Sequence, residues 1–152
     1  MRPVLIADIG ATNCRFAVTT EDGRPAQMIK LRGDVVGSLQ EAIAHYLDEA
    51  KVRPRAAVLA VAAPVAGDAI SMTNRAWNFR LTELAARFGW TAARAMNDFE
   101  AVARGVSRLT PDDVRPLGPT MLPPSGPRVV FGPGTGLGVA ALVPNGPSWR
   151  VV

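Results

Sequence analysis

Residues Val4–Thr20, VLIADIGATNCRFAVTT, hold two apolar runs separated by a short turn of small and polar residues. The runs Val4–Asp8 and Cys14–Thr20 are rich in aliphatic and β-branched side chains, which predicts a β-hairpin. In the turn, Ile9–Asn13, small side chains would let backbone N–H groups approach phosphate oxygens, and Thr12 adds a hydroxyl. The stretch therefore predicts two paired strands joined by a turn that is able to bind an anion.

Asp8, at the end of the first run, places a carboxylate beside this turn. A carboxylate beside bound phosphate oxygens could hold a hydrated Mg²⁺ ion. A tight hairpin closed by Gly10, with Asp8 capping the turn, fits the same spacing equally well. The residues alone leave both interpretations open.

The segments after the hairpin alternate between strand and helix patterns. Ser38 is a candidate N-cap with Glu41 three residues later, which predicts a capping box at the start of a helix. Strands are predicted at Ala26–Leu31, Ala56–Ala62 and Thr91–Met96, and helices from Ser38, at Leu81–Phe88 and from Asp98 onward, with an inward stripe of Phe99, Val102, Ala103 and Val106. The continuous apolar run Ala56–Ala62 is typical of a covered strand in a parallel sheet. The order of these elements predicts an α/β fold.

A second hairpin pattern follows a proline-rich segment, Arg115–Arg128. Val129–Phe131 and Val139–Val143 flank the loop Gly132–Gly138, and shifting Leu5–Val18 by 124 residues lays it on Val129–Leu142. The match is short, but it suggests two related units that each open with a glycine turn. We therefore expect residues 1–110 to form an α/β lobe and residues 111–152 to form a crossing and the opening hairpin of a second lobe.

The loop Gly132–Gly138 has four glycines and a central threonine. No Gly-Lys-Ser/Thr sequence follows, so it is not a Walker loop, and a β-rich segment follows where a dinucleotide fingerprint would open a helix. Two such glycine turns could hold one polyphosphate between them; the alternative is a plain connecting turn.

Asn97 and Asp98 lie where a predicted strand meets a predicted helix. The helix dipole favours an ionised carboxylate there, so Asp98 would be charged and able to accept a proton. On the residues alone an ordinary N-cap is the favoured interpretation. Two polar loops, Pro64–Asp68 and Met72–Trp77, follow the most apolar strand, and they fit either a ligand site or a structural hairpin anchored by Trp77 and Phe79.

Five motifs together resemble the bacterial glucokinase family, in that family's order and spacing. They are Asp8–Ala17 (DIGATNCRFA), Pro64–Asp68 (PVAGD), Met72–Trp77 (MTNRAW), Asn97–Ala101 (NDFEA) and Gly132–Ala140 (GPGTGLGVA). The resemblance covers essentially the whole chain. It implies a ribonuclease-H-like (actin-like ATPase) fold, with a mixed-sheet α/β lobe, flanking helices and the truncated start of a second lobe.

The same resemblance implies ATP-dependent phosphorylation of D-glucose to glucose 6-phosphate, with ATP and Mg²⁺ as cofactors. Asp98 would be the catalytic base, and Asn97, Asp98 and Gly136 would bind the sugar. The residues implied in nucleotide binding are Ala7, Asp8, Ile9, Gly10, Ala11, Thr12, Gly134 and Thr135, with Asp8 also at the metal. A homodimer of the full-length protein would be compatible with the family.

The sequence departs from the family pattern in two respects. Ala11 stands where the family usually has a second glycine, and the turn would be kept if φ at Ala11 is negative. The family's later sugar-binding and adenosine-binding motifs are not found in these 152 residues. We therefore expect an incomplete kinase that does not phosphorylate glucose alone, with Val129–Val143 poorly covered.

Two alternatives stay open beside a glucokinase. One is a related kinase for another hexose, such as fructose, mannose or an N-acetyl sugar. The other is a non-catalytic sugar-binding regulator; no helix-turn-helix pattern precedes Asp8, and a retained Asp98 also argues against it.

Composition argues against several other classes of function. The net charge is +4, but the arginines are scattered from Arg2 to Arg150, so nucleic-acid binding is not expected. A single cysteine, Cys14, and a single histidine, His45, argue against disulfides, zinc sites and most Ser-His schemes; Cys14 is expected to be buried. No targeting segment and no apolar run of about 18–20 residues is present, so we expect a cytoplasmic protein without membrane contact.

Overall fold

The computed structural model describes residues 3–118, 126–133 and 137–152. Two compact units are present, Met1–Asp98 and Phe99–Val152. The expected lobe boundary at residue 110 stays a proposal; within this chain, the helix that follows Asp98 belongs to the second unit.

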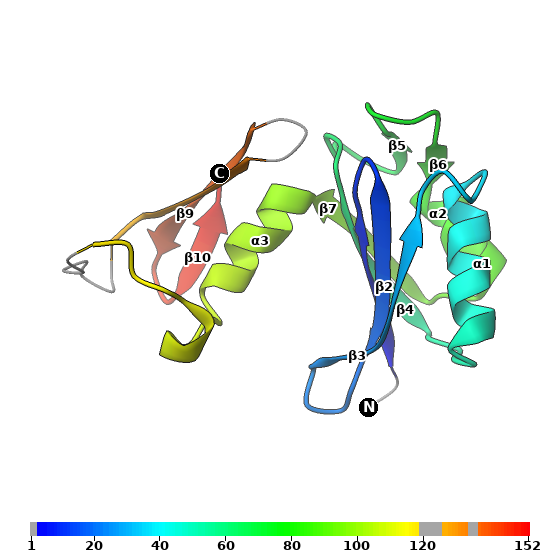
Figure 1. Ribbon diagram of the computed structural model, residues 1–152, viewed down its shortest axis with the longest axis horizontal. Helices are drawn as coiled ribbons and strands as arrows, with labels where there is room; N and C mark the ends of the chain where they lie inside the picture. Colours follow the sequence, from blue (N-terminus) through cyan, green and yellow to red (C-terminus); the bar gives the residue numbers. More distant parts are fainter. Residues whose placement is uncertain (1–2, 119–125, 134–136) are drawn as a thin grey trace. The chain divides into compact units, whose positions relative to one another are not determined.

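A five-stranded mixed sheet forms the centre of the first unit (Figure 1). Its strands are β1 (Val4–Ile9), β2 (Asn13–Thr19), β3 (Pro25–Arg32), β4 (Ala56–Val61) and β7 (Ala92–Asn97), in the order β3-β2-β1-β4-β7. β1, β2 and β3 pair antiparallel, whereas β1, β4 and β7 pair parallel. The predicted hairpin and the parallel position of Ala56–Ala62 are both confirmed, although residues of β4 alternate between buried and half-buried.

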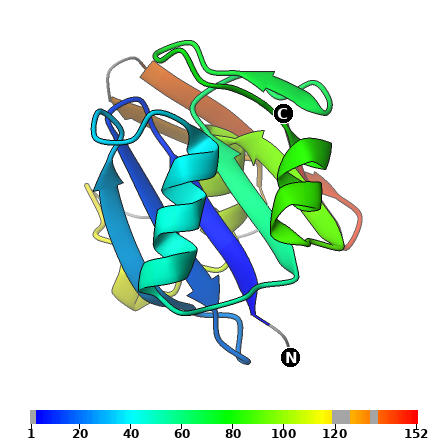
Figure 2. The ribbon, with the colours of Figure 1, turned by 90° about the vertical axis from the view of Figure 1, so that its right-hand side faces the viewer.

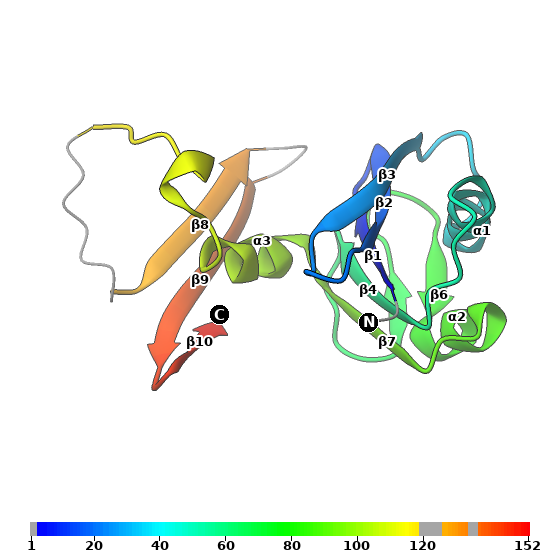
Figure 3. The same cartoon turned by 90° about the horizontal axis from the view of Figure 1, so that it is seen from below.

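Helices α1 (Leu39–Glu49) and α2 (Leu81–Phe88) cover one face of this sheet (Figures 2 and 3). Their apolar sides join the alternate inward residues of the strands in one core, which includes Leu5, Ile9, Phe16, Ile43, Tyr46, Leu59 and Leu84. The Ser38 hydroxyl accepts from the backbone N–H of Glu41, as predicted. The Glu41 carboxylate accepts from the backbone N–H of Gly37 at 2.8 Å, one residue before the N-cap, so the second hydrogen bond of the predicted capping box is displaced by one residue.

Helix α2 is capped at both ends, by Asp68 at its N-terminus and by Gly89 at its C-terminus. The Asp68 carboxylate accepts from the backbone N–H and the hydroxyl of Thr82, at 2.9 and 3.0 Å. At the other end, Gly89 has a φ of 67°, a left-handed conformation that glycine adopts without strain. The predicted end of this helix at Gly89 is thus confirmed.

A small antiparallel pair, β5 (Ala69–Ser71) and β6 (Asn78–Arg80), follows β4. Trp77 and Phe79 are buried in the core of the unit, with 7% and 4% exposure. The interpretation of this segment as a structural hairpin anchored by these two rings is confirmed.

The second unit contains α3 (Asp98–Val106) from Phe99 onward, a short 3-10 helix (Pro111–Asp113) and a three-stranded sheet. The strands are β8 (Arg128–Pro133), β9 (Leu137–Asn145) and β10 (Ser148–Val151), in the order β10-β9-β8. Ala103 of α3 packs on Ala140 and Leu142, with Phe99 and Val106 beside them. Val102, expected on the inward stripe, is 50% exposed, because it lies on the other side of the helix.

One face of this sheet is open. Its exposed members are Val129, Phe131, Leu137, Val139 and Val152. The expectation that Val129–Val143 would be poorly covered is therefore confirmed for this face, while the opposite face packs on α3. Among the described residues, no helix is long and apolar enough to cross a membrane.

Candidate functional site

Strand register brings most of the predicted site of the first unit to one edge of its sheet. Ile9 lies opposite Val61, and Val61 lies opposite Asn97, so the carboxyl ends of β1, β4 and β7 are level. Strands in a sheet are about 4.8 Å apart, which separates the main chains of Ile9 and Asn97 by roughly 10 Å. Open α/β sheets bind ligands at this edge.

The turn between β1 and β2 is closed by a backbone hydrogen bond from Gly10 to the carbonyl of Asn13, 3.0 Å long. A Cβ atom at Gly10 would lie 3.1 Å from that carbonyl oxygen, so the close approach favours glycine. Ala11 is absent from the non-glycine residues with positive φ in the described chain, which are Gln27 and Lys51. Its substitution for the usual glycine is therefore compatible with the turn, as expected.

Two carbonyl groups of this turn accept hydrogen bonds from other segments of the chain. The Ala11 carbonyl accepts from the Arg75 guanidinium, and the Thr12 carbonyl accepts from Gly33 N–H at 2.9 Å. Within the described residues, the backbone N–H groups of Ala11 and Thr12 have no hydrogen-bond acceptor. Two such donors at the end of a strand fit an anion, which agrees with the predicted phosphate contact.

Asp8 already has a cationic neighbour. Its Oδ2 accepts from the Arg15 guanidinium at 2.7 Å, from the directly opposite position on β2, and both side chains are about half exposed. No group of three or more acidic, His or Cys side chains able to hold a metal occurs in the described parts of the chain. A lone carboxylate still fits Mg²⁺, since this ion keeps several waters and takes its other ligands from substrate phosphates.

Asn97 and Asp98 sit where the sequence predicts, at the junction of β7 and α3. Asn97 ends β7, and its amide donates to the carbonyl of Ala63, just beyond β4, over 3.4 Å. Asp98 is the first residue of α3 and is half-buried. The side chains therefore stand at the same sheet edge as Asp8 and the turn, while their roles in catalysis stay predictions.

Predicted residues of the second glycine loop, Gly134, Thr135 and Gly136, lie outside the described residues. The flanking glycines have a packing role. Gly132 and Gly138 face each other across β8 and β9, and a Cβ at Gly138 would overlap the Phe99 ring, while one at Gly132 would lie 3.2 Å from it. Two of the glycines in this loop are therefore explained by the packing of the Phe99 ring against the strands.

Cys14 lies beside the turn and is fully buried, as expected. Burial raises the pKa of its thiol, and the Arg75 guanidinium opposes this only in part. The thiol is therefore protonated at neutral pH, which excludes it as a ready nucleophile.

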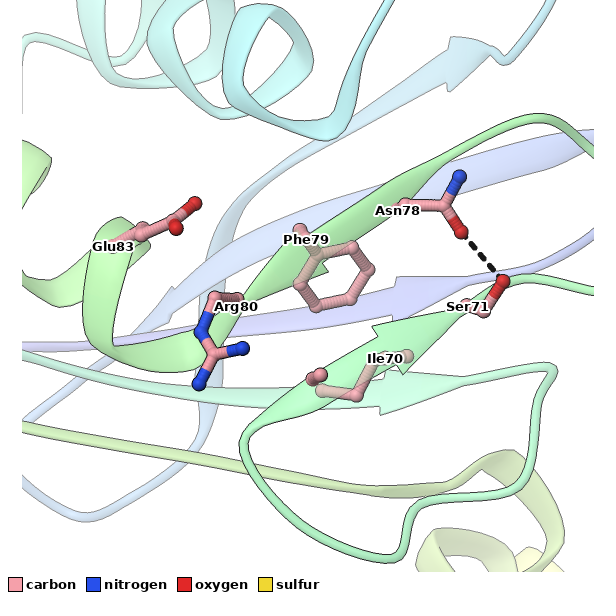
Figure 4. Close-up of a pocket in the computed structure, with 7 residues that line it drawn as sticks. Ile70, Ser71, Asn78, Phe79, Arg80 and Glu83 are labelled. Atoms are coloured by element: carbon pink, nitrogen blue, oxygen red, sulfur yellow. Dashed lines mark hydrogen bonds between the residues drawn. The ribbon is translucent and has the colours of Figure 1, made fainter.

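Arg75 lies in the Met72–Trp77 motif, but the sequence assigned no role to it. It lies 64 positions from Ala11, so no local pattern links them. A pocket elsewhere in the unit is formed by β5, β6 and the start of α2, where Ile70, Phe79, Arg80 and Glu83 surround it (Figure 4). None of the predicted site residues lines that pocket.

Comparisons with known proteins give one consistent family. A family model described as Glucokinase matches residues 5–152. The chain is 43% identical to a glucokinase of Sinorhizobium medicae (strain WSM419), over 97% of this chain and 44% of that protein. Thus it spans less than half the length of that relative.

Solved structures agree with this fold. The crystal structure of a glucokinase from an Antarctic psychrotroph superposes with a TM-score of 0.87 at 32% identity, covering 100% of this chain and 49% of that one. A glucokinase from Balamuthia mandrillaris in complex with glucose gives 0.76 at 26% identity, covering 99% and 47%. The expected ribonuclease-H-like, actin-like α/β fold is confirmed.

Proposed function

Because the chain belongs to the glucokinase family, we propose that it supplies the phosphate turn and the proton acceptor of an ATP-dependent glucose kinase. The observation that carries this proposal is the shared sheet edge. The turn after Asp8 follows β1 and the pair Asn97–Asp98 ends β7, and both strands pair in parallel with β4, which lies between them. Phosphate donors and a carboxylate are thereby fixed on one rigid scaffold.

The proposed reaction is the transfer of the γ-phosphoryl group of ATP to the 6-hydroxyl of glucose. The sugar oxygen forms a bond to phosphorus as the bond from phosphorus to the ADP oxygen breaks, and the hydroxyl proton passes to the Asp98 carboxylate. The N–H groups of Ala11 and Thr12 bind phosphate oxygens, and Asn97 orients the sugar. Mg²⁺ beside Asp8 would neutralise charge on the phosphates. Since phosphoryl transfer has a loose transition state, positioning and charge neutralisation supply most of the catalysis.

Asp98→Asn in the complete enzyme tests the base. We expect kcat to fall about 10²–10⁴-fold, the usual contribution of a general base, with glucose binding largely kept. Asp48→Asn, an exposed change on α1, is the matched control and should leave turnover unchanged. Turnover of the Asp98→Asn enzyme near that of the wild type would refute the assignment.

We further propose that the 152-residue chain is an incomplete kinase, since its relatives are more than twice as long. The purified chain should release no ADP in a coupled assay with glucose and ATP. Glucose- and ATP-dependent ADP release by this chain would contradict that. For the complete enzyme, a panel of glucose, fructose, mannose and N-acetyl sugars separates glucokinase from the alternative hexose kinases.

A further inference from the structure

Arg75 reaches from the loop between β5 and β6 to the turn between β1 and β2. Its two terminal nitrogens donate to the Ala11 carbonyl and, at 3.6 Å, to the Cys14 sulfur. Its guanidinium carbon lies 4.2 Å above the centre of the buried Trp77 ring. The planar group is therefore held by a ring on one side and by two acceptors at its edge.

The loop that presents Arg75 is itself closed. Met72 N–H donates to the Trp77 carbonyl over 3.0 Å, and both side chains are buried, with 5% and 7% exposure. The arginine thus projects from a fixed base.

Gly33 completes the arrangement from a third segment. Its N–H donates to the Thr12 carbonyl, and a Cβ at this position would overlap the Arg75 guanidinium. The absence of a side chain at Gly33 therefore leaves the space that Arg75 occupies, and the two carbonyls of the turn are held side by side.

Planarity of the peptide bond gives these contacts a directional effect. In a trans peptide the carbonyl of one residue and the N–H of the next point in opposite directions. Holding the Ala11 carbonyl at Arg75 therefore aims the Thr12 N–H away from Arg75. Thr12 is exposed, and its N–H has no acceptor among the described residues.

We infer that Arg75 is a positioning residue for phosphate binding: it fixes the Ala11–Thr12 peptide so that the Thr12 N–H faces the anion. The inference rests on the proposed phosphate-binding function of the turn. Arg75 does not touch the anion in this scheme, and the loop between β5 and β6 becomes part of the phosphate site through it.

The first test needs no ligand. Residual dipolar couplings in the isotope-labelled 152-residue chain report the direction of the Thr12 N–H bond. We expect Arg75→Leu to change the Thr12 coupling while couplings in β1, β4 and β7 stay the same. Arg75→Lys, which keeps the charge and one donor nitrogen, should retain most of the wild-type value. A Thr12 coupling in Arg75→Leu equal to that of the wild type, with the strands unchanged, would overturn the inference.

The second test uses inorganic tripolyphosphate with Mg²⁺, followed by amide shifts of Ala11 and Thr12. We expect Arg75→Leu to weaken binding at least ~10-fold, equivalent to about 1.4 kcal/mol, and Arg75→Lys to stay within a few-fold of the wild type. Arg87→Leu, the same change at an exposed site on α2, controls for the lost charge. Equal affinity of Arg75→Leu and the wild type overturns the inference.

The two tests separate the inference from the function on which it rests. If the wild type shows no tripolyphosphate shift at the turn, the phosphate-binding proposal fails. The dipolar coupling of Thr12 then still decides whether Arg75 fixes the Ala11–Thr12 peptide, and an unchanged coupling overturns that step.

Discussion

The hairpins β1–β2 and β8–β9 have similar sequence patterns and very different surroundings. Phe16 in the first hairpin is fully buried, whereas Phe131 in the second is 71% exposed. β1 has β4 on its other side and α1 over its inward face, while β8 is an edge strand of a sheet with one open face. The alternating pattern specifies a hairpin in both places, and the neighbouring segments decide which face is buried.

Glycine has a different function in each hairpin. Gly10 permits a close approach between two backbone segments, its own and the Asn13 carbonyl. Gly138 permits a close approach between a strand and a side chain, the Phe99 ring. Neither glycine is among those with positive φ in the described chain, so both are explained by space.

Phe16→Ala and Phe131→Ala test the contrast in burial most strongly. Phe16→Ala should lower the free energy of unfolding of the first unit by about 3–5 kcal/mol, because it leaves a cavity in the core. Phe131→Ala should change that of the second unit by less than about 0.5 kcal/mol, as at other exposed sites. Amide hydrogen exchange of β1 and β9 measures each unit separately. Similar losses in both variants would remove the contrast.

Gly138→Ala tests the seat of the aromatic ring. The added methyl group overlaps Phe99, so we expect a loss of about 1–3 kcal/mol in the second unit, as for other overpacked sites. Phe99→Leu in the same chain should restore part of this loss, because leucine does not extend over the strand. Protection of β9 amides in the single and double variants is the measurement. An equal loss with and without Phe99 would show that the ring is not the cause.

Local patterns in the sequence predicted much of the fold. Ser38 was recognisable as an N-cap because its partner lies three residues away, and Gly89 because a helix pattern ends there. The cap of α2 by Asp68 was not, since Asp68 lies 14 positions before Thr82 in another loop. β10 was also missed, although the turn signal Asn145-Gly146 precedes it and its four residues alternate between polar and apolar, a pattern that predicts a hairpin with β9.

In the candidate site too, features with a local sequence pattern could be predicted, whereas contacts between distant residues could not. Recognisable motifs contain Asp8, the turn after it, Asn97 and Asp98. These residues lie at one edge of the sheet because β1, β4 and β7 run parallel. Arg75 and Gly33 act through contacts that only the folded chain creates. Gly132 and Gly138 were interpreted as part of a phosphate loop, because a sequence does not distinguish a glycine needed by a ligand from one needed by a ring.

Acid should affect the first unit through Asp68. The Thr82 backbone N–H, with the Thr82 hydroxyl and Arg80, holds the pKa of this carboxyl below its ordinary value, against a smaller opposing effect of burial. A lowered folded-state pKa means that the stabilisation is complete above about pH 4 and is lost as pH falls through the folded-state pKa.

Hydrogen exchange of the Thr82 amide at decreasing pH measures this loss, after correction for intrinsic exchange. Asp68→Asn, which keeps an acceptor but does not titrate, should flatten the acid dependence. A variant that keeps the wild-type acid dependence would assign it to another group.

The open face of the second unit should respond least in stability and most in dye binding. Val129→Thr with Val139→Thr keeps β-branched side chains on exposed positions, so we expect less than about 0.5 kcal/mol change. Fluorescence of a bound apolar dye such as ANS should fall, because the apolar patch becomes smaller. Val35→Thr, at an exposed position outside this face, is the control and should leave the dye signal unchanged. Equal dye signals in all three proteins would place the dye elsewhere.

The buried thiol of Cys14 makes the first unit individually observable. It is the only cysteine in the chain, lies directly after the turn between β1 and β2, and is shielded from reagents and held protonated by its surroundings. A thiol-labelling reagent can therefore react only after the β1–β2 region opens. The labelling rate, read by mass spectrometry, would report how often that region opens, without interference from the second unit and without an introduced probe.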